Sequence, residues 1–330
     1  MSLLSYSRFR TRRRAEKLYD QAKELIARGS FERAMDIGRK LRKVDYDGAY
    51  EIEALAHQGL GNLEDAVRVL DEGLDRGADV WPIWMLLGSI LSELDRYDEA
   101  LEAFDSADEC EAPDHDLINL NRAVVVLRQA DFPRVLELVG DPAKNAHPFG
   151  AAALRATALG LLGRHHEAEH LAMRTLDAWL KSDQLEGQRD VGELAMIVAG
   201  RRFQRGEDRA ALRSFAIDWW RRSEHERLLV FIRSLVPVAT SADGRYFRIS
   251  FYARFPFADE ELEGIHRVKY WMSADMVADN SDEALSLLFE ISPPPQGAQI
   301  DICEVMDLEP RPNNVKGVYA TSQKQFFKDE

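Results

Sequence analysis

Residues 81–107 hold the pattern that most restricts how this chain can fold. Large apolar side chains such as Trp84 recur at helical spacing around the small residue Gly88, and a second helical pattern places Ala100 four residues before Phe104. Two antiparallel helices that cross closely need small residues at the crossing and large ones around it. The segment therefore predicts a helical hairpin. One such hairpin cannot bury its own apolar face, so it requires stacked neighbours on both sides.

The packing position of the second helix in this hairpin recurs along the chain. Its residues are Ala34, Ala66, Ala100, Val135 and Ala168, at separations of 32, 34, 35 and 33 residues. A period near 34 residues with this motif resembles the tetratricopeptide repeat, over about residues 15–222. The resemblance implies six hairpins, the last with Ala211 and Phe215 at its core positions, and then a capping helix over 224–236.

A different pattern begins near residue 241, where aromatic and β-branched residues become frequent. Alternation predicts strands over 245–255, 266–277 and 298–308, a helix over 281–291, and a last strand or ribbon over 315–327. The predicted fold is therefore mostly α. It consists of a basic N-terminal segment (1–14), a solenoid of helical hairpins with its capping helix (15–240), and a small α+β domain of order β-β-α-β (241–330).

The net charge of −14 is distributed unevenly along the chain. Residues 1–50 contain 13 Lys and Arg against 7 Asp and Glu, whereas residues 51–120 contain 3 against 19. The acidic block disfavours nucleic acid and favours a basic protein partner; the alternative is an acidic face that serves solubility. We expect residues 1–14 to form a frayed helical turn, with contact to an anionic surface as the alternative.

The apolar segments, the first residues and the two cysteines indicate the compartment and the redox state of the chain. The longest apolar runs fall short of the roughly 20 residues that a membrane helix needs, and the first residues do not resemble a secretory signal. Cys110 and Cys303 are far apart and suggest neither a disulfide framework nor a zinc site, so both are expected to be buried thiols. A cytoplasmic protein without a membrane or nucleic-acid partner is the expectation.

One string has the form of a catalytic motif. His166-Glu167-Ala168-Glu169-His170 matches H-E-x-x-H, which on a helix offers two imidazoles to zinc and a glutamate as general base. The same string begins the second helix of the fifth hairpin, where Ala168 falls on the packing position. We therefore expect the string to be structural, and the sequence predicts no catalytic residue, no metal and no cofactor.

In tetratricopeptide arrays the first helices of successive hairpins line a groove, and the resemblance implies which residues line it here. We expect Thr157 and Leu161 in the fifth hairpin, together with a set that we assign to partner binding. That set is Tyr19, Lys23, Leu55, Met85, Ser89, Glu93, Leu120, Val124, Arg128, Met196 and Phe203. The family is best known for a clamp of Lys, Arg and Asn around a peptide carboxylate; only Lys23 and Arg128 are available, well separated, so no such clamp is predicted.

The hypothesis that best fits these patterns is a non-enzymatic scaffold or adaptor. It would bind a peptide or protein partner, of basic character, in an apolar groove with acidic flanks, as bacterial immunity-type, chaperone-type or regulatory proteins do. The groove can alternatively be filled by the chain's own ends. The competing hypothesis is an enzyme with its site in the C-terminal domain or at the seam between domains, least of all a zinc hydrolase that uses residues 166–170.

Overall fold

The computed structural model describes most of the chain as two compact units. The described residues are 3–46, 48–182, 186–235, 245–256, 267–294, 298–308, 315–322 and 325–328. Unit 1 is Met1–Leu154 and unit 2 is Arg155–Glu330. The domain boundary predicted near residue 240, the helix stop at Pro237 and the start of a strand at His266 lie outside the described residues.

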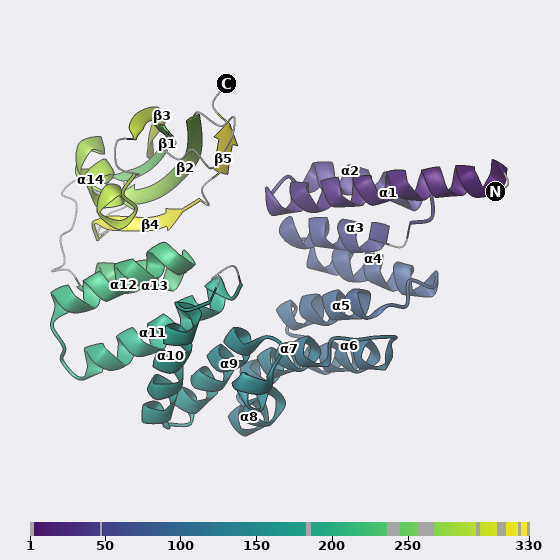
Figure 1. Ribbon diagram of the computed structural model, residues 1–330, viewed down its shortest axis with the longest axis horizontal. Helices are drawn as coiled ribbons and strands as arrows, with labels where there is room; N and C mark the ends of the chain where they lie inside the picture. The colour runs from purple at the N-terminus through teal and green to yellow at the C-terminus, as the bar shows by residue number, and fades with distance from the viewer. Residues whose placement is uncertain are drawn as a thin grey trace. The chain divides into compact units, whose positions relative to one another are not determined.

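Unit 1 is a stack of helical hairpins that follow one another in chain order (Figure 1). Its helices are α1 (Leu3–Ala27), α2 (Phe31–Arg42), α3 (Gly48–Gly59), α4 (Leu63–Asp75), α5 (Trp81–Glu93), α6 (Tyr97–Glu109), α7 (His115–Arg128) and α8 (Phe132–Val139), then a 3₁₀ turn (Pro142–Lys144) and the start of α9 (Pro148–Leu161). The resemblance to tetratricopeptide hairpins is confirmed by this order of elements.

The N-terminal segment differs from the expectation of a frayed turn at residues 1–14. Helix α1 begins at Leu3 and runs without a break to Ala27. Its sequence holds no Pro or Gly, Arg12 lies 3.7 Å from Glu16 one turn later, and Ala15 and Ala22 are buried against the following helices. A helix with such an anchor extends backward until a breaking residue stops it.

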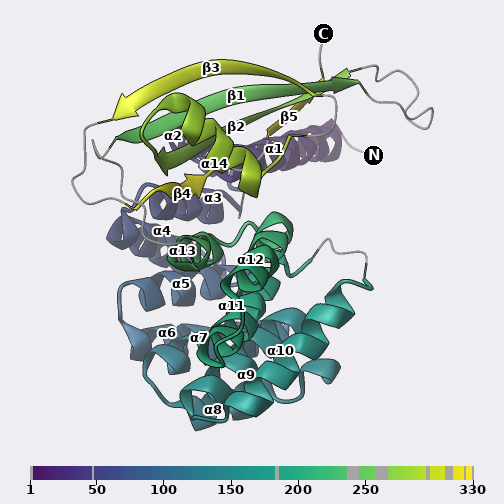
Figure 2. The ribbon, with the colours of Figure 1, turned by 90° about the vertical axis from the view of Figure 1, so that its left-hand side faces the viewer.

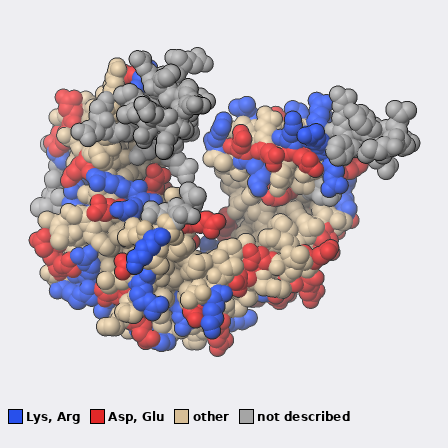
Figure 3. Space-filling model, in the orientation of Figure 1, with Lys and Arg blue, Asp and Glu red and all other residues tan. Residues whose placement is uncertain are grey.

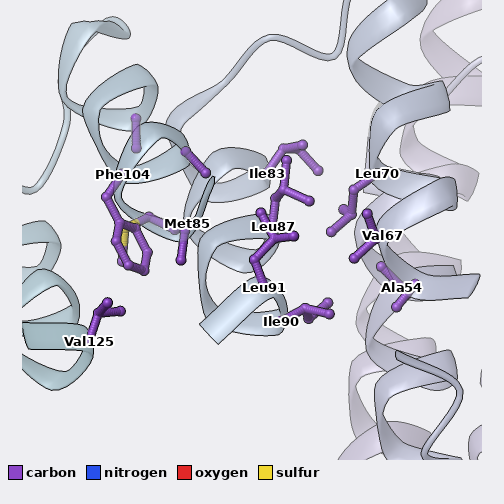
Figure 4. Packing of buried hydrophobic residues seen from close by; sticks show 14 of the residues in the cluster. Ala54, Val67, Leu70, Ile83, Met85, Leu87, Ile90, Leu91, Phe104 and Val125 are labelled. Atoms are coloured by element: carbon purple, nitrogen blue, oxygen red, sulfur yellow. The ribbon is translucent and has the colours of Figure 1, made fainter. Parts of the chain in front are cut away.

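The core of unit 1 lies between the two helices of each hairpin and between neighbouring hairpins. In the third hairpin, Phe104 is 1% exposed and packs against Gly88, where an added Cβ would lie 2.5 Å from the Phe104 ring. Figure 4 shows Ile83 and Ile90 of α5 on the side of the helix that faces Leu70 and Val67 of α4. The small residues that set the repeat period are buried in unit 1, namely Ala34, Ala66, Ala100 and Val135.

Unit 2 begins with the rest of α9 and continues the helical pattern. Its further helices are α10 (His165–Trp179), α11 (Gln188–Gln204), α12 (Arg209–Ser223) and α13 (Glu226–Leu235). The core positions predicted for α12 are wrong by one residue: Leu212 and Ala216 are buried, whereas Ala211 is exposed. The cause is the N-cap, because Asp208 accepts a bond from the Ala211 amide and so places Ala211 in the solvent-facing first turn.

The C-terminal part of unit 2 is an antiparallel sheet with one helix. It contains β1 (Tyr246–Pro256), β2 (Arg267–Val277), α14 (Ser281–Ile291), β3 (Gln299–Leu308), β4 (Gly317–Thr321) and β5 (Gln325–Lys328). The strand order is β3-β1-β2-β4, with β5 also paired to β2. The predicted order β-β-α-β is confirmed. The last segment, expected as one strand or ribbon, forms two strands.

Helix α14 covers one face of this sheet (Figure 2). Phe251 of β1 is fully buried and meets Phe289 of α14 with ring centroids 5.8 Å apart. Strand β3 pairs only with β1 in the described sheet and forms its edge. Cys303 on this strand is exposed and Cys110 at the end of α6 is half-buried, so the expectation that both cysteines are buried is wrong. Cys303 lies at a sheet edge, where no neighbouring strand covers it.

The sheet packs against the last helices of the solenoid within unit 2. The Arg233 guanidinium of α13 lies 3.9 Å from the centre of the Tyr319 ring of β4. Arg221 of α12 donates hydrogen bonds of 2.8 and 2.9 Å to the carbonyl oxygens of Ile291 and Glu290 at the end of α14. The α+β part is therefore held to the end of the solenoid by arginines that bind backbone carbonyls and an aromatic ring.

Candidate functional site

The first helices of successive hairpins in unit 1 lie side by side. Each is tied to the next by a side-chain hydrogen bond: the Tyr19 hydroxyl donates to Glu51 Oε2 at 2.7 Å, Gln58 Nε2 to Glu93 Oε1 at 2.6 Å, and Arg128 to the Ser92 carbonyl oxygen at 2.8 Å. We call the surface formed by α1, α3, α5 and α7 the first-helix face. Three residues predicted for partner binding, Tyr19, Glu93 and Arg128, take part in these bonds.

The expected partner-binding residues of unit 1 differ in how far they reach solvent. Exposed positions are Lys23, Glu93, Val124 and Arg128; half-buried positions are Tyr19, Leu55 and Ser89. Met85 and Leu120 are only 8% and 7% exposed, so they pack between helices and cannot contribute much contact area to a ligand. Met85 belongs to the core cluster of the third hairpin, which removes the adaptable surface role expected of it.

Charges on the first-helix face are nearly balanced. Lys23 lies 5.5 Å from the centre of the Tyr19 ring, and Arg128 is bonded to a carbonyl oxygen. Two carboxylates of this face, Glu51 and Glu93, each accept a bond from a neighbouring first helix. Burial, and next the bond to Glu51, raises the pKa of Tyr19, so its hydroxyl remains a donor at neutral pH.

The acidic block lies mainly on the second helices, not beside the groove as expected. Figure 3 shows acidic side chains over the part of unit 1 that contains α4 and α6. Exposed carboxylates on these two helices are Glu64, Asp71, Asp75, Asp98, Glu99, Glu102, Asp105 and Glu109. Some are neutralised, since Arg96 binds Glu99 at 2.7 Å through Nε. Partial burial raises the pKa of Asp71; Arg96 opposes this, and the nearby Asp75 and Glu99 add to it.

Unit 2 contains a hollow of about 300 Å³ between α9, α10 and α11, reached also by α13. We call it the α9–α11 pocket; the residues used below are Thr157, Gly160, Leu161, Met196, Gly200 and Arg201. Three of them, Thr157, Leu161 and Met196, were predicted as groove residues, and the structure brings these three together. Phe203 lies outside the pocket lining, where it is 43% exposed and meets the Phe231 ring edge-on at 6.1 Å.

The sequence patterns assigned no binding role to Gly160, Gly200 or Arg201, which line the α9–α11 pocket. Gly200 lies within a helix, where glycine lowers stability, so its presence in the sequence could have indicated a packing or binding role at this position.

The H-E-x-x-H string occupies the first turns of α10, where its carboxylates are engaged by arginines. Arg164 binds Glu167 through two bonds of 2.7 Å, and Arg205 of α11 binds Glu169 at 2.6 and 2.7 Å. The bond from Arg205 is the main cause that lowers the pKa of Glu169. Ala168 is 1% exposed. Within the described part of the chain, no three His, Cys, Asp or Glu residues are grouped so that they could hold a metal ion.

A second hollow of unit 2, of about 600 Å³, lies between α11, the α12–α13 turn and Thr321 of β4. It contains His225, whose Nε2 lies 3.1 Å from Glu193 Oε1 and whose Nδ1 is buried without a hydrogen-bond partner. The Ser223 hydroxyl donates to the Trp219 carbonyl oxygen at 2.8 Å. Because serine and imidazole are not bonded to each other, these residues do not form a nucleophile–base pair.

Comparison with known proteins agrees with this geometry. Residues 82–110 match the family model of the tetratricopeptide repeat, and they cover most of the third hairpin. Residues 82–110 therefore hold a tetratricopeptide repeat, and the chain has the fold of tetratricopeptide repeat proteins. No curated protein matches this chain.

Solved structures with the same fold belong to proteins of diverse function. The Cut9–Hcn1 hetero-tetramer of the APC/C is similar at 10% identity and a TM-score of 0.52, over 65% of this chain and 41% of that one. The type IV pilus biogenesis factor PilW matches at 16% identity and 0.50, over 66% and 97%. The quorum sensor NprR from B. thuringiensis matches at 15% identity and 0.50, over 67% and 70%. At these identities the likeness shows the fold alone.

Among the described helices, none combines the length and the apolar character that crossing a membrane requires.

Proposed function

We propose that this protein is a non-enzymatic adaptor that binds a protein partner on the first-helix face of unit 1. The observation that carries the proposal is the row of first helices joined by side-chain bonds, which presents Lys23, Val124 and Arg128 to solvent on one surface. Those bonds fix the spacing of the surface before a ligand arrives, and a preorganised surface loses less entropy on binding. The Cut9–Hcn1 hetero-tetramer supports the proposal, since a protein of this fold there belongs to an assembly with another protein.

The partner that we propose is basic where it meets unit 1. Its basic residues would lie along the acidic second helices α4 and α6, since the first-helix face itself is nearly neutral. A cytoplasmic setting is part of the proposal, and the free thiols Cys110 and Cys303 support it, because an oxidising compartment favours paired cysteines.

Photo-crosslinking tests the docking surface with a pair of matched positions. Val124 on α7 is 36% exposed and Val44, in the turn after α2, is 44% exposed. Benzoylphenylalanine placed at Val124 should capture a defined partner in the native host, while the same group at Val44 should not. Adding Arg128→Glu should weaken the capture. Equal capture from both positions, or none from Val124, would refute docking on this face.

Charge reversal tests the basic character of the partner separately. Asp98→Lys with Glu102→Lys on α6 should weaken binding of the captured partner and flatten its salt dependence. The control pair is Glu24→Lys with Glu32→Lys, which makes the same charge change on exposed positions of α1 and α2. Equal effects of the two pairs would show that only net charge matters and that α6 is no contact site.

A further inference from the structure

The α9–α11 pocket has a floor made of two glycines that the fold itself does not require. Other helical glycines are explained by packing, since an added Cβ would lie 2.5 Å from Phe104 at Gly88 and 2.4 Å from His225 at Gly192. At Gly160 and Gly200 an added Cβ would meet nothing within 4 Å, and neither residue has a positive φ. Both line the pocket.

Gly200, inside α11, lowers helix stability by about 1 kcal/mol relative to alanine, and Gly160, in the last turn of α9, lowers it by less. Neither tight packing nor backbone conformation compensates for that loss. What the glycines provide is open space beside the apolar side chains of Leu161 and Met196. Because glycine has no side chain, a flat side chain or the backbone of a ligand can approach the two helices closely at these positions.

One cation of the pocket has no carboxylate partner among the described residues. Arg202 near the end of α11 binds Glu207, and Arg205, which follows the helix as its C-cap, binds Glu169, each through two bonds; Arg201 donates only to the neutral amide of Gln204 within the described part of the chain. The Nε atom of Arg201 is buried and has no hydrogen-bond partner. The nearest influence of opposite charge is Glu169, whose pKa Arg201 helps to lower, but both oxygens of Glu169 are held by Arg205.

The other charged groups that line the pocket leave it with a positive excess. Glu193 carries the one carboxylate of its described lining, and it is shared by Arg227, at 3.0 Å, and His225, at 3.1 Å. Arg201 therefore remains available to a ligand carboxylate, for which a guanidinium is well suited in a partly desolvated site.

From the open glycine floor and the unpaired Arg201 we infer that the α9–α11 pocket binds a peptide segment of a protein partner, in which an apolar side chain is followed by Asp or Glu. The apolar side chain lies over Gly160 and Gly200, and the carboxylate binds Arg201. The volume of about 300 Å³ is at the small end for ligand pockets and matches one or two side chains. This inference rests on the proposed function for the claim that the partner is a protein.

The test uses the full chain and short synthetic peptides, acetylated and amidated so that no terminal charge takes part. A fluorescent peptide with a central Phe-Asp pair in a Ser-Gly background is compared with Phe-Asn and Ser-Asp versions by anisotropy. We expect Phe-Asp to bind at least about 5-fold more tightly than either, the effect of one partly desolvated ion pair or one buried ring. Equal binding of the three peptides, or no binding, would overturn the inference.

Two variants locate the binding. Gly200→Leu fills the floor while improving helix propensity, and about a 10-fold loss of binding is expected; an unchanged far-UV circular dichroism spectrum would show that the loss does not come from unfolding. Ala178→Leu, at an exposed position of α10 outside the pocket lining, is its control and should bind as the wild type does. In Arg201→Gln the Phe-Asp peptide should bind no better than the Phe-Asn peptide. Arg209→Gln, which changes an exposed arginine of α12, should keep the preference for Phe-Asp. Unchanged binding in Gly200→Leu or Arg201→Gln would refute the site.

Free 3-phenylpropionate combines a phenyl ring and a carboxylate in a small molecule, so it tests whether the pocket binds a free metabolite instead of a peptide. It should displace the peptide only at concentrations at least about 10-fold above the peptide itself, because it lacks the backbone contacts. Displacement at equal concentration would overturn the assignment to a peptide. If the peptides do not bind but crosslinks from Val124 persist, this inference alone is rejected. If the peptides bind as expected but Val124 gives no crosslinks, the proposed docking face alone is rejected.

Discussion

Replacing two glycines by alanine should change stability in opposite directions. Gly88 lies in α5 and Gly200 in α11, both with ordinary helical backbone. Each Gly→Ala change gains about 1 kcal/mol from helix propensity. At Gly200 nothing opposes that gain, since the new Cβ has no neighbour within 4 Å.

At Gly88 the new Cβ would lie 2.5 to 2.8 Å from three atoms of the Phe104 ring, which is 1% exposed and cannot move away freely. Overpacking of this kind costs about 1–3 kcal/mol, so the net effect should be a loss of up to about 2 kcal/mol. The two variants should therefore differ by roughly 1–3 kcal/mol although the chemical change is identical.

Hydrogen exchange is the assay of choice, because helices of a repeat protein can open separately and one melting curve mixes them. Amide protection should rise about 5-fold around Gly200→Ala in α11 and should fall around Gly88→Ala in α5 and α6. In a Phe104→Leu background the smaller side chain should remove most of the penalty of Gly88→Ala. Stabilisation of both single variants to the same extent would refute the packing argument.

Three further changes are tested by hydrogen exchange of the helices that hold the changed residues. Phe104→Ala should cost about 3–5 kcal/mol, as expected for a fully buried aromatic side chain, and a cost below about 1 kcal/mol would contradict the predicted core. Arg42→Met should cost about 3 kcal/mol, because Glu53, which is 4% exposed and lies 3.3 Å from Arg42, would keep a buried charge without its partner. The cost should become smaller at acid pH, where Glu53 is protonated. Lys40→Met, at an exposed position, is the control. The bond from His225 is the main cause that lowers the pKa of Glu193 in the folded protein. The stability that Glu193 provides is therefore complete above its unfolded pKa of about 4.3 and is lost as the pH falls through the lower folded pKa. The difference in unfolding free energy between wild type and Glu193→Gln should vanish below pH about 4, and a difference that grew there would contradict the assigned direction of the pKa shift.

The hairpins could be predicted because their signals are local. A small residue every 33 or so positions, with large apolar residues one turn away, specifies a crossing of two helices whatever surrounds it. The same holds for α14, where Asn280 caps the helix at the residue that the sequence indicates. Helix α12 shows the limit, because its core register was set by the N-cap at Asp208 and not by the apolar residues Ala211 and Phe215.

The candidate site could be predicted only in part, since it depends on which side chains neighbouring helices cover. The first-helix register gave Lys23, Val124 and Arg128 as surface residues, but it could not show that Met85 is taken up by the core. Placement of the acidic block failed for a similar reason. A count of charges along the chain does not separate the two helices of a hairpin, and most of these carboxylates belong to the second one.

Hydrogen exchange of the full chain with and without its captured partner tests the central claim most directly. If the first-helix face of unit 1 is the docking surface, amides in α3, α5 and α7 should gain protection beyond that of the loops and turns of the same hairpins, and Val124 should lie in a protected peptide. Protection confined to the C-terminal sheet, or absent from all three helices, would contradict the account.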